Sequence, residues 1–284
     1  MSAYPACPVA KMENLLLATD ISKYSEGAVR ESINIAKTCG SKLFIVGVAE
    51  QPDIREFADT FPLEAADRLE KETSVHLESV KEKARNENVD CETIFRKGPE
   101  IYKYIIEEAK NNNAEMIIMG RRGRTGIARL MMGSVTARTI GHSPVNVLVV
   151  PKTAKVTFEK ILVPTDGSEY SEMAASEAIK IAKRTNSTLL ALSVAKKDEN
   201  LPAAETSVGK LKEYAEKEEV KVEGLTLKGE PYKVIVDTVN DKNVNLIVMG
   251  SHGKTGLDRI LMGSVTERVI GHAPCAVLVA KQKK

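Results

Sequence analysis

Tryptophan is absent from this 284-residue sequence, and aromatic residues make up only 4% of it. Proteins that stack bases on aromatic side chains need more of them, so we expect no nucleic-acid partner. The net charge is only +2, and lysines and glutamates are interspersed, which also argues against a basic binding face. No apolar run approaches the roughly 20 residues of a membrane-spanning helix, so we expect no membrane association.

Cysteine is scarce as well, and the positions of the four cysteines predict neither a disulfide framework nor a metal site: Cys7, Cys39, Cys91 and Cys275. Reduced thiols are typical of intracellular proteins, so we expect a cytoplasmic location. Residues 1–11 lack the charged lead and long apolar core of a signal peptide. We therefore interpret them as a loose leader.

What the sequence does contain is a long internal repeat. The segment Met119–Val150 recurs as Met249–Ala280, with 19 of 32 positions identical. Each copy has an apolar run ending in glycine, a glycine-containing loop, Gly-Ser-Val-Thr and a second apolar run. This order predicts strand, loop, helix and strand in both copies, and the repeat predicts a tandem architecture.

Each half is predicted to alternate wholly apolar strands with helical segments. We expect strands at Leu15–Ala18, Leu43–Val48, Cys91–Phe95, Met116–Met119 and Val145–Val150, and again at Ile161–Val163, Leu189–Val194, Leu225–Leu227, Leu246–Met249 and Ala276–Ala280. Helices are predicted from Ser22 to about Thr38, within Gln51 to about Arg85, and over Ile101–Lys110 and Met173–Ala182. Strands that are apolar throughout indicate a parallel sheet covered by helices on both faces.

The length suits two domains of about 140 residues. We predict a leader at 1–11, a first domain at 12–152, a linker at 153–157 and a second domain at 158–284. The first half is longer, since Asp20 and Gly120 are 100 positions apart whereas Asp166 and Gly250 are 84 apart. The extra residues after the second strand of the first half form either a lid or a longer helix, and we favour the helix.

The glycine loops have the composition of a phosphate site. Their spacing is Gly-x2-Gly-x9-Gly-Ser, with glycines at 120, 123 and 133 and again at 250, 253 and 263. Glycine lets the backbone turn and lets a ligand approach closely, while a Gly-Ser pair opening a helix offers free N–H groups to an anion. The alternative is that these glycines form structural turns only. Ser264 followed by Glu267 also reads as a capping box, which would make this serine a structural residue.

Two better-known phosphate loops are excluded. Gly253-Lys254-Thr255 resembles the end of a P-loop, but Val248 occupies the position that requires the first glycine. No G-x-G-x-x-G follows an early strand either.

An aspartate follows the first strand of each half, as Thr19-Asp20 and Thr165-Asp166. In open parallel sheets, ligands bind beyond the carboxyl ends of the strands, where the winding direction reverses. If the first and fourth strands meet at that reversal, each aspartate faces a glycine loop. There it can accept hydrogen bonds from ribose hydroxyls or hold a metal on the phosphates, although aspartate also commonly starts helices.

These features resemble the universal stress protein family in tandem. The resemblance rests on the doubled G-x2-G-x9-G-[ST] loop, the Thr-Asp pair and a proline before each last strand (Pro144 and Pro274), and it covers both halves almost completely. It implies two Rossmann-like (adenine nucleotide alpha hydrolase-like) α/β domains. Each would have a five-stranded parallel sheet of order 3-2-1-4-5 with helices on both faces. Family members that keep the full glycine loop bind ATP or another adenine nucleotide.

The resemblance also implies which residues bind the nucleotide. In the second half they are Pro164, Thr165, Asp166, Val194, Gly250, Gly253, Gly263, Ser264 and Val265. In the first half they are Ala18, Thr19, Asp20, Val48, Gly120, Gly123, Gly133, Ser134 and Val135. The aspartates would hold ribose, or Mg²⁺ bound to the nucleotide; no other metal site is expected.

Some positions differ between the two halves, and others recur in both halves without an assigned ligand contact. Ile21 stands where the second half has Gly167, so the second half is the stronger prediction. Arg121 and Arg122 replace the second half's Ser-His pair and, as exposed charges, are expected to be solvated. His142 and His272 recur before the last strands, where we expect each to bond a carbonyl. His76 is expected to be exposed.

The function that follows is an ATP- or AMP-binding stress-response protein acting as a nucleotide-dependent sensor or regulator. One alternative is a nucleotide-independent interaction module with structural glycine loops; another is a slow ATPase. No nucleophile–base pair or paired acidic motif is apparent, so we predict no catalytic residue. The resemblance suggests that the last strands pair within one chain as a pseudo-dimer. Further homodimerisation and an unidentified protein partner are also expected.

Overall fold

The computed structural model describes residues 7, 12–51, 63–123, 132–253 and 262–282. Its first half contains β1 (Asn14–Ala18), α1 (Glu26–Cys39), β2 (Lys42–Glu50), α3 (Leu63–Asn86), β3 (Cys91–Gly98), α4 (Ile101–Asn111), β4 (Met116–Gly120), α5 (Ser134–His142) and β5 (Asn146–Val150). All five predicted strands and the predicted helices are present. Residues 52–62, at the start of the predicted long helical segment, lie outside the described residues.

The second half repeats the plan. It contains β6 (Lys160–Pro164), α6 (Glu169–Thr185), β7 (Thr188–Ala195), the 3-10 helix η1 (Asp198–Asn200), α7 (Leu201–Lys217), β8 (Val222–Lys228), α8 (Pro231–Lys242), β9 (Leu246–Gly250), α9 (Ser264–His272) and β10 (Ala276–Ala280). As expected, the helix after the second strand is longer in the first half, since α3 has 24 residues and α7 has 17.

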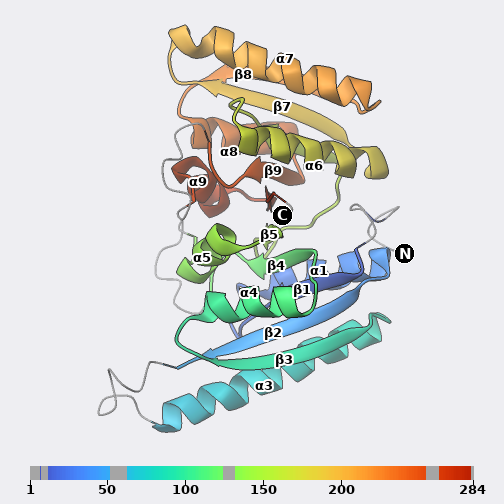
Figure 1. Cartoon of the computed structure of the whole chain (residues 1–284), viewed down its shortest axis with the longest axis vertical. Helices are drawn as coiled ribbons and strands as arrows, with labels where there is room; N and C mark the ends of the chain where they lie inside the picture. Colours follow the sequence, from blue (N-terminus) through green and yellow to red (C-terminus); the bar gives the residue numbers. More distant parts are fainter. Residues whose placement is uncertain (1–6, 8–11, 52–62, 124–131, 254–261, 283–284) are drawn as a thin grey trace.

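The ten strands form one continuous sheet in the order β3-β2-β1-β4-β5-β10-β9-β6-β7-β8 (Figure 1). Within each half the strands are parallel and follow the expected 3-2-1-4-5 order. β5 and β10 join the halves in antiparallel register, with Leu148 opposite Leu278. The expected pairing of the last strands within one chain is therefore present.

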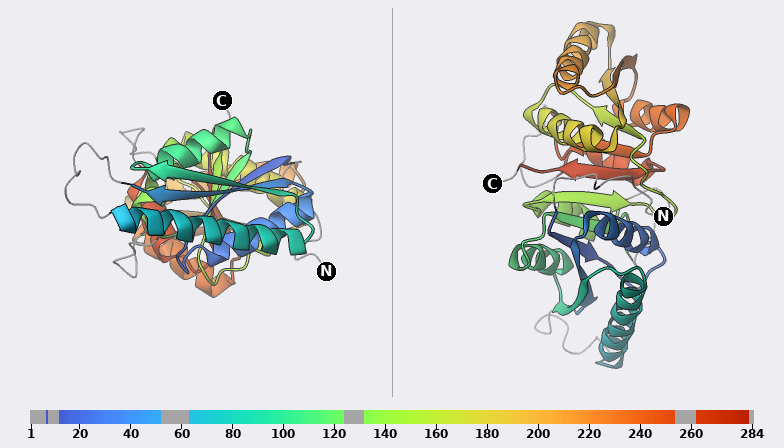
Figure 2. Two further views of the ribbon diagram at one scale, coloured as in Figure 1. Left: turned by 90° about the horizontal axis from the view of Figure 1, so that it is seen from below. Right: turned by 90° about the vertical axis from the view of Figure 1, so that its right-hand side faces the viewer.

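Helices cover both faces of the sheet (Figure 2), and the core lies in two layers between these helices and the sheet. α1, α3, α6 and α7 pack on one face, and α4, α5, α8 and α9 pack on the other. β1 shows why both layers form: Leu15 and Leu17 enter the first cluster, whereas Leu16 and Ala18 enter the second. Successive side chains of a strand point to opposite faces, so a wholly apolar strand must be covered on both.

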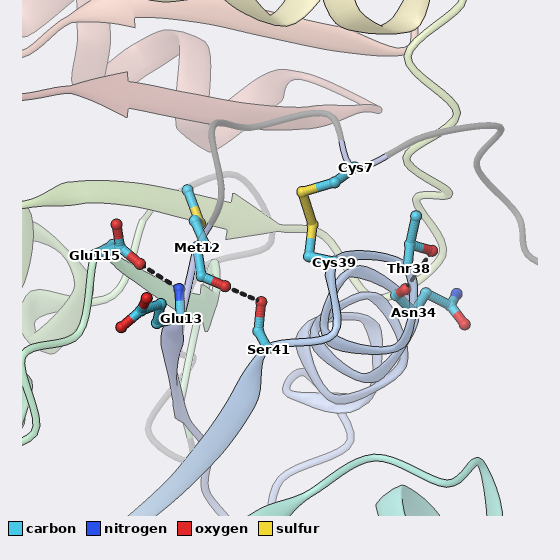
Figure 3. Close-up of a disulfide and its surroundings, with 8 residues drawn as sticks. All are labelled: Cys7, Met12, Glu13, Asn34, Thr38, Cys39, Ser41 and Glu115. Carbon is cyan, nitrogen blue, oxygen red and sulfur yellow. Dashed lines mark hydrogen bonds between the residues drawn. A yellow bond between two sulfur atoms is a disulfide. The ribbon is translucent and has the colours of Figure 1, made fainter.

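One cysteine prediction is wrong. Cys7 and Cys39 form a disulfide across a sequence separation of 32 residues, joining the N-terminal segment to the end of α1 (Figure 3). Beside it, the Ser41 hydroxyl donates to the Met12 carbonyl at 2.6 Å. The sequence spacing gives no signal for this pair because the fold brings the two residues together. Cys91 and Cys275 remain thiols, but the cysteine argument for a reduced, cytoplasmic setting no longer holds.

The helices of the structure bear on the expected absence of membrane association. Across the described part of the chain, none combines the length and the apolar character needed to cross a bilayer.

Candidate functional site

A cavity of about 740 Å³ opens at the carboxyl end of the second half's sheet. Its wall comes from the ends of β6, β7 and β9 and from the starts of α7, α8 and α9. All nine residues predicted for this half line it: Pro164, Thr165, Asp166, Val194, Gly250, Gly253, Gly263, Ser264 and Val265. The tertiary structure therefore brings together residues that are up to 101 positions apart in the sequence.

Sheet topology places the cavity. β6 pairs with β7 on one side and with β9 on the other, so the winding direction reverses beside β6. The connections after β6 and β9 therefore run in different directions, and a crevice remains between them. Asp166 enters this crevice directly after β6, and its Oδ1 accepts a hydrogen bond from the Ser168 N–H at 3.0 Å.

The loop glycines serve close approach rather than a special backbone angle. None of the six has a positive φ, so a left-handed backbone is not what requires glycine at these positions. A Cβ on Gly253 would lie 2.6 Å from Asp166 Oδ2, and one on Gly250 would lie 2.7 Å from the Tyr170 carbonyl oxygen. Gly250 is thus required for packing against α6, whereas Gly253 leaves room for the carboxylate in the crevice.

Helix α9 begins at the cavity wall, and its first residues correct the capping-box interpretation. The N-cap is Gly263, in extended conformation, and no side-chain hydrogen bond caps the helix. Ser264 is the first helical residue, and Glu267 donates its N–H to the Gly263 carbonyl at 3.0 Å. A capping box requires the serine at the N-cap position, so Ser264 has no such structural role here.

The first half repeats this arrangement. A Cβ on Gly123 would lie 3.0 Å from Asp20 Oδ2, and the Thr136 hydroxyl donates to the Gly120 carbonyl at 3.1 Å. The second half has the equivalent Thr266–Gly250 bond at 2.9 Å. The remaining predicted residues hold positions matching their second-half counterparts on β1, β2 and at the start of α5: Ala18, Thr19, Val48, Gly133, Ser134 and Val135.

The turn after the first strand differs between the halves. Gly167 has φ 74°, and its N–H donates to Thr165 Oγ1 at 3.3 Å. Ile21 has no such left-handed backbone. The Ser22 N–H donates to Asp20 Oδ1 as the Ser168 N–H does to Asp166 Oδ1, and the Ser22 hydroxyl also donates to Asp20 Oδ1. A branched side chain disfavours the left-handed region, which explains the different turn.

His76 is not exposed as expected. It is half-buried on α3, and its Nε2 lies 2.9 Å from Thr19 Oγ1. Burial lowers the pKa of His76 from its ordinary value of 6.5, against the opposing effect of the nearby Asp20 carboxylate and with a smaller lowering effect of Lys83. The prediction failed because a lone histidine among charged residues gives no indication of which helix face it occupies.

The two loop arginines are not solvated either. Arg122 is buried, and Arg121 extends to the other half, where its Nη1 donates to the carbonyls of Ala273 (3.1 Å) and Ile270 (3.4 Å). Burial, and then the charge of Arg122, lower the pKa of Arg121. Arg121 therefore caps the last carbonyls of α9 and links the first glycine loop to the second half.

His142 and His272 have the expected structural role. Nδ1 of His142 lies 2.9 Å from the Arg138 carbonyl oxygen, and Nδ1 of His272 lies 2.7 Å from that of Arg268. Both bonds run one helical turn back along the same helix.

Part of the cavity wall was not predicted from the sequence. Residues after β7, in η1, on α7 and α8 and in the second glycine loop also line it: Lys196, Asn200, Ala203, Ala204, Ser207, Pro231, Ile235 and His252. Helices α7 and α8 were not predicted, although Val208, Leu211 and Ala215 show helical spacing. His252 is buried against the Tyr170 ring, with centroids 5.1 Å apart, and the Ser251 hydroxyl lies 3.0 Å from its Nδ1.

Metal and thiol chemistry find no support in the described residues. No group of three or more histidine, cysteine or acidic side chains there is placed to hold a metal ion. Burial raises the pKa of Cys275 to about 12, which keeps this thiol protonated and unreactive at neutral pH.

Comparison with known proteins identifies the family. The sequence pattern described as "Universal stress protein family" matches residues 11–151 and 157–281. Universal stress protein MJ0531 of Methanocaldococcus jannaschii is 41% identical over 143 residues, covering 45% of this chain and 84% of that protein.

Solved structures agree on the fold. A universal stress protein from Archaeoglobus fulgidus is 23% identical with a TM-score of 0.74, covering 95% of this chain and 98% of that one. A universal stress protein solved in complex with cAMP is 24% identical, covers 44% of this chain and 97% of that one, and has a TM-score of 0.39, too low to transfer a ligand. Because the family pattern matches both halves, this chain belongs to the universal stress protein family.

Proposed function

We propose that the protein binds an adenine nucleotide, ATP or AMP, in the cavity of its second half and acts as a nucleotide-dependent sensor or regulator in a stress response. The observation that carries the proposal is the convergence of all nine predicted residues on one cavity of about 740 Å³. This volume lies within the roughly 300–1,000 Å³ typical of small-molecule sites. The equivalent crevice of the first half is the second candidate site.

The wall divides into regions that suit the parts of a nucleotide. Pro164 and Val194, with the apolar side chains of Leu192 and Ile235, offer a surface for the adenine ring. The Asp166 carboxylate is placed to accept hydrogen bonds from ribose hydroxyls, or to hold Mg²⁺ that enters with ATP. The start of α9 presents N–H groups and the positive end of its dipole to the phosphates.

The binding free energy that a nucleotide site of micromolar affinity requires is modest. A micromolar dissociation constant corresponds to about 8 kcal/mol. Hydrogen bonds to charged phosphates contribute roughly 1.5–3 kcal/mol each, and burial of the adenine adds to them. A few backbone amides at the start of α9 therefore supply enough, after the cost of ordering the ligand.

One observation favours the alternative of an interaction module. Gly250 is required for packing against α6, and Gly120 for packing against Tyr24 and Ser25 just before α1, so glycines at these positions persist without any ligand. A Cβ on Gly253 would meet only the side-chain end of Asp166 rather than backbone, so Gly253 and Ser264 distinguish the two functions. Slow ATP hydrolysis has no residue in the described part of the chain to support it.

Isothermal titration calorimetry with ATP, with AMP and with buffer alone tests the proposal. Saturable heat with a nucleotide is expected, and Gly263→Val combined with Ser264→Ala should abolish it, since a Cβ on Gly263 would already lie 3.3 Å from His252 Cα. Gly209→Ala is the matched control, because nothing lies within 4 Å of its added Cβ. Absence of heat from the wild-type protein, after any co-purified nucleotide is removed, would favour the interaction module.

Assembly and location belong to the same proposal. We propose that the joined halves act as the family's pseudo-dimer, that two chains associate further, and that the protein works in the cytoplasm with an unidentified protein partner. Light scattering would give the solution mass, and cell fractionation would give the location. A single-chain mass would remove the homodimer without affecting the nucleotide site.

A further inference from the structure

His76 and Ser207 occupy equivalent places in the two halves. Leu77, Val80 and Ala84 of α3 and Val208, Leu211 and Ala215 of α7 are buried in the same packed layer with the same spacing. This register places His76 at the position of Ser207, which lines the second cavity. An imidazole thus stands in the first half where the second half has a small hydroxyl.

The His76 side chain is directed at the residue before the site aspartate. Its Nε2 lies 2.9 Å from the hydroxyl of Thr19, whose counterpart Thr165 lines the second cavity. Asp20 follows Thr19, and its carboxylate is close enough to oppose the lowering of the His76 pKa. The imidazole therefore lies beside the first half's equivalent of the cavity wall.

The turn after the first strand explains why Thr19 is available to His76. In the second half, Thr165 Oγ1 accepts the Gly167 N–H and lies 3.2 Å from Ser171 Oγ, so its hydroxyl is engaged by the turn and by α6. Ile21 does not form this turn, and the Thr19 hydroxyl instead meets α3.

A second pair of differences between the halves lies where α3 meets β2 beside the first crevice, and here the larger side chain is on α3. Thr73 stands where Ala204 lines the second cavity, and Gly47 stands where Ser193 does. A Cβ on Gly47 would lie 3.0 Å from Thr73 Cγ2, so the larger side chain of α3 occupies the space that β2 gives up. In the first half, the space between β2 and α3 is thus filled by a side chain of α3.

We infer that the two crevices are unequal: the second takes the nucleotide, and His76 keeps the first from taking it, so that each chain holds one nucleotide rather than two. This inference rests on the proposed function. His76 is the residue that decides which half binds the nucleotide. Exchanging His76 and Ser207 between the halves should therefore move nucleotide binding from the second half to the first.

Calorimetric stoichiometry with ATP tests the inference on the full chain, stripped of bound nucleotide. The wild-type protein should bind one ATP per chain, and His76→Ser should bind two. Ser207→His should weaken the second-half site by at least about tenfold. The double variant His76→Ser/Ser207→His should again bind one ATP, now in the first half. Val75→Ser, an exposed change on α3, is the matched control and should leave the stoichiometry at one.

A measurement on the wild-type protein guards against variants that fail to fold. Photolabelling with 8-azido-ATP, followed by peptide mapping, should mark peptides of the second half and leave the first half unlabelled. Two ATP per chain with equal labelling of both halves would overturn the inference and leave the proposed function standing. No binding by the wild type or by His76→Ser would overturn the proposed function itself.

Discussion

The carboxylate of Asp166 occupies the space that a side chain on Gly253 would need: a Cβ there would lie 2.6 Å from Oδ2. The first half has the same relationship in looser form, with 3.0 Å between a Cβ on Gly123 and Asp20 Oδ2. Two residues separated by most of a domain are thus fitted to each other at the mouth of the crevice.

Replacing Gly253 and Gly250 separates binding from folding. Gly253→Ala should push aside only the flexible end of Asp166, so the free energy of unfolding should change by less than about 1 kcal/mol while the ATP dissociation constant rises. Gly250→Ala meets the Tyr170 backbone at 2.7 Å and should destabilise the protein by about 1–3 kcal/mol. Urea denaturation and calorimetry measure both effects. Unchanged ATP affinity of Gly253→Ala would contradict a ligand role for Asp166.

Arg121 should stabilise the junction of the two halves. Arg121→Ala removes hydrogen bonds to two carbonyls at the end of α9 and should cost about 1–2 kcal/mol of unfolding free energy. Arg68→Ala is the control, since Arg68 forms an exposed ion pair with Glu72 and should cost under about 0.5 kcal/mol. Equal urea midpoints for the two variants would show that the Arg121 contact is absent in solution.

The lowered pKa of His76 has a defined consequence for stability. A histidine whose pKa is depressed by folding binds protons more readily when unfolded, so stability should fall as the pH drops through about 6.5. Above about pH 6.5 the imidazole is neutral in both the folded and the unfolded state, so this loss of stability does not occur there. His76→Asn should therefore show a shallower loss of unfolding free energy between pH 7 and pH 5. A His76 imidazole resonance that titrates above 6.5 would contradict the burial seen here.

Reduction of the Cys7–Cys39 disulfide should destabilise the first half. The bond closes a loop with a sequence separation of 32 residues, and chain entropy predicts a loss of about 3–4 kcal/mol on reduction. Dithiothreitol should lower the thermal midpoint of the wild type, and Cys7→Ser should lower it equally and remove the response. If reductant has no effect on the purified protein, the two thiols are not joined.

Much of the fold could be read from local pattern. Runs such as Leu15–Ala18 and Met116–Met119 are apolar throughout and too short for helices, which indicates buried strands, and their repetition in the second half indicates the tandem plan. Asp166, the loop glycines and Ser264 were found because they sit at a strand end and in the glycine loop. The other second-half site residues came only from the family resemblance: Pro164, Thr165, Val194 and Val265. The spacing around Val208 was present but was not recognised as a helix, and the wall that α7 and α8 add to the cavity was therefore missed.

The sequence by itself determined the strands and the doubled glycine loop, because these depend on short-range periodicity and on residues close in the chain. Only the tertiary structure decided that Cys7 meets Cys39, that Arg121 caps α9 and that His76 meets Thr19. Each of these contacts joins residues far apart along the chain. Which side chains meet there depends on helix orientation and on the packing of the two halves, and neither leaves a periodic signal in the sequence.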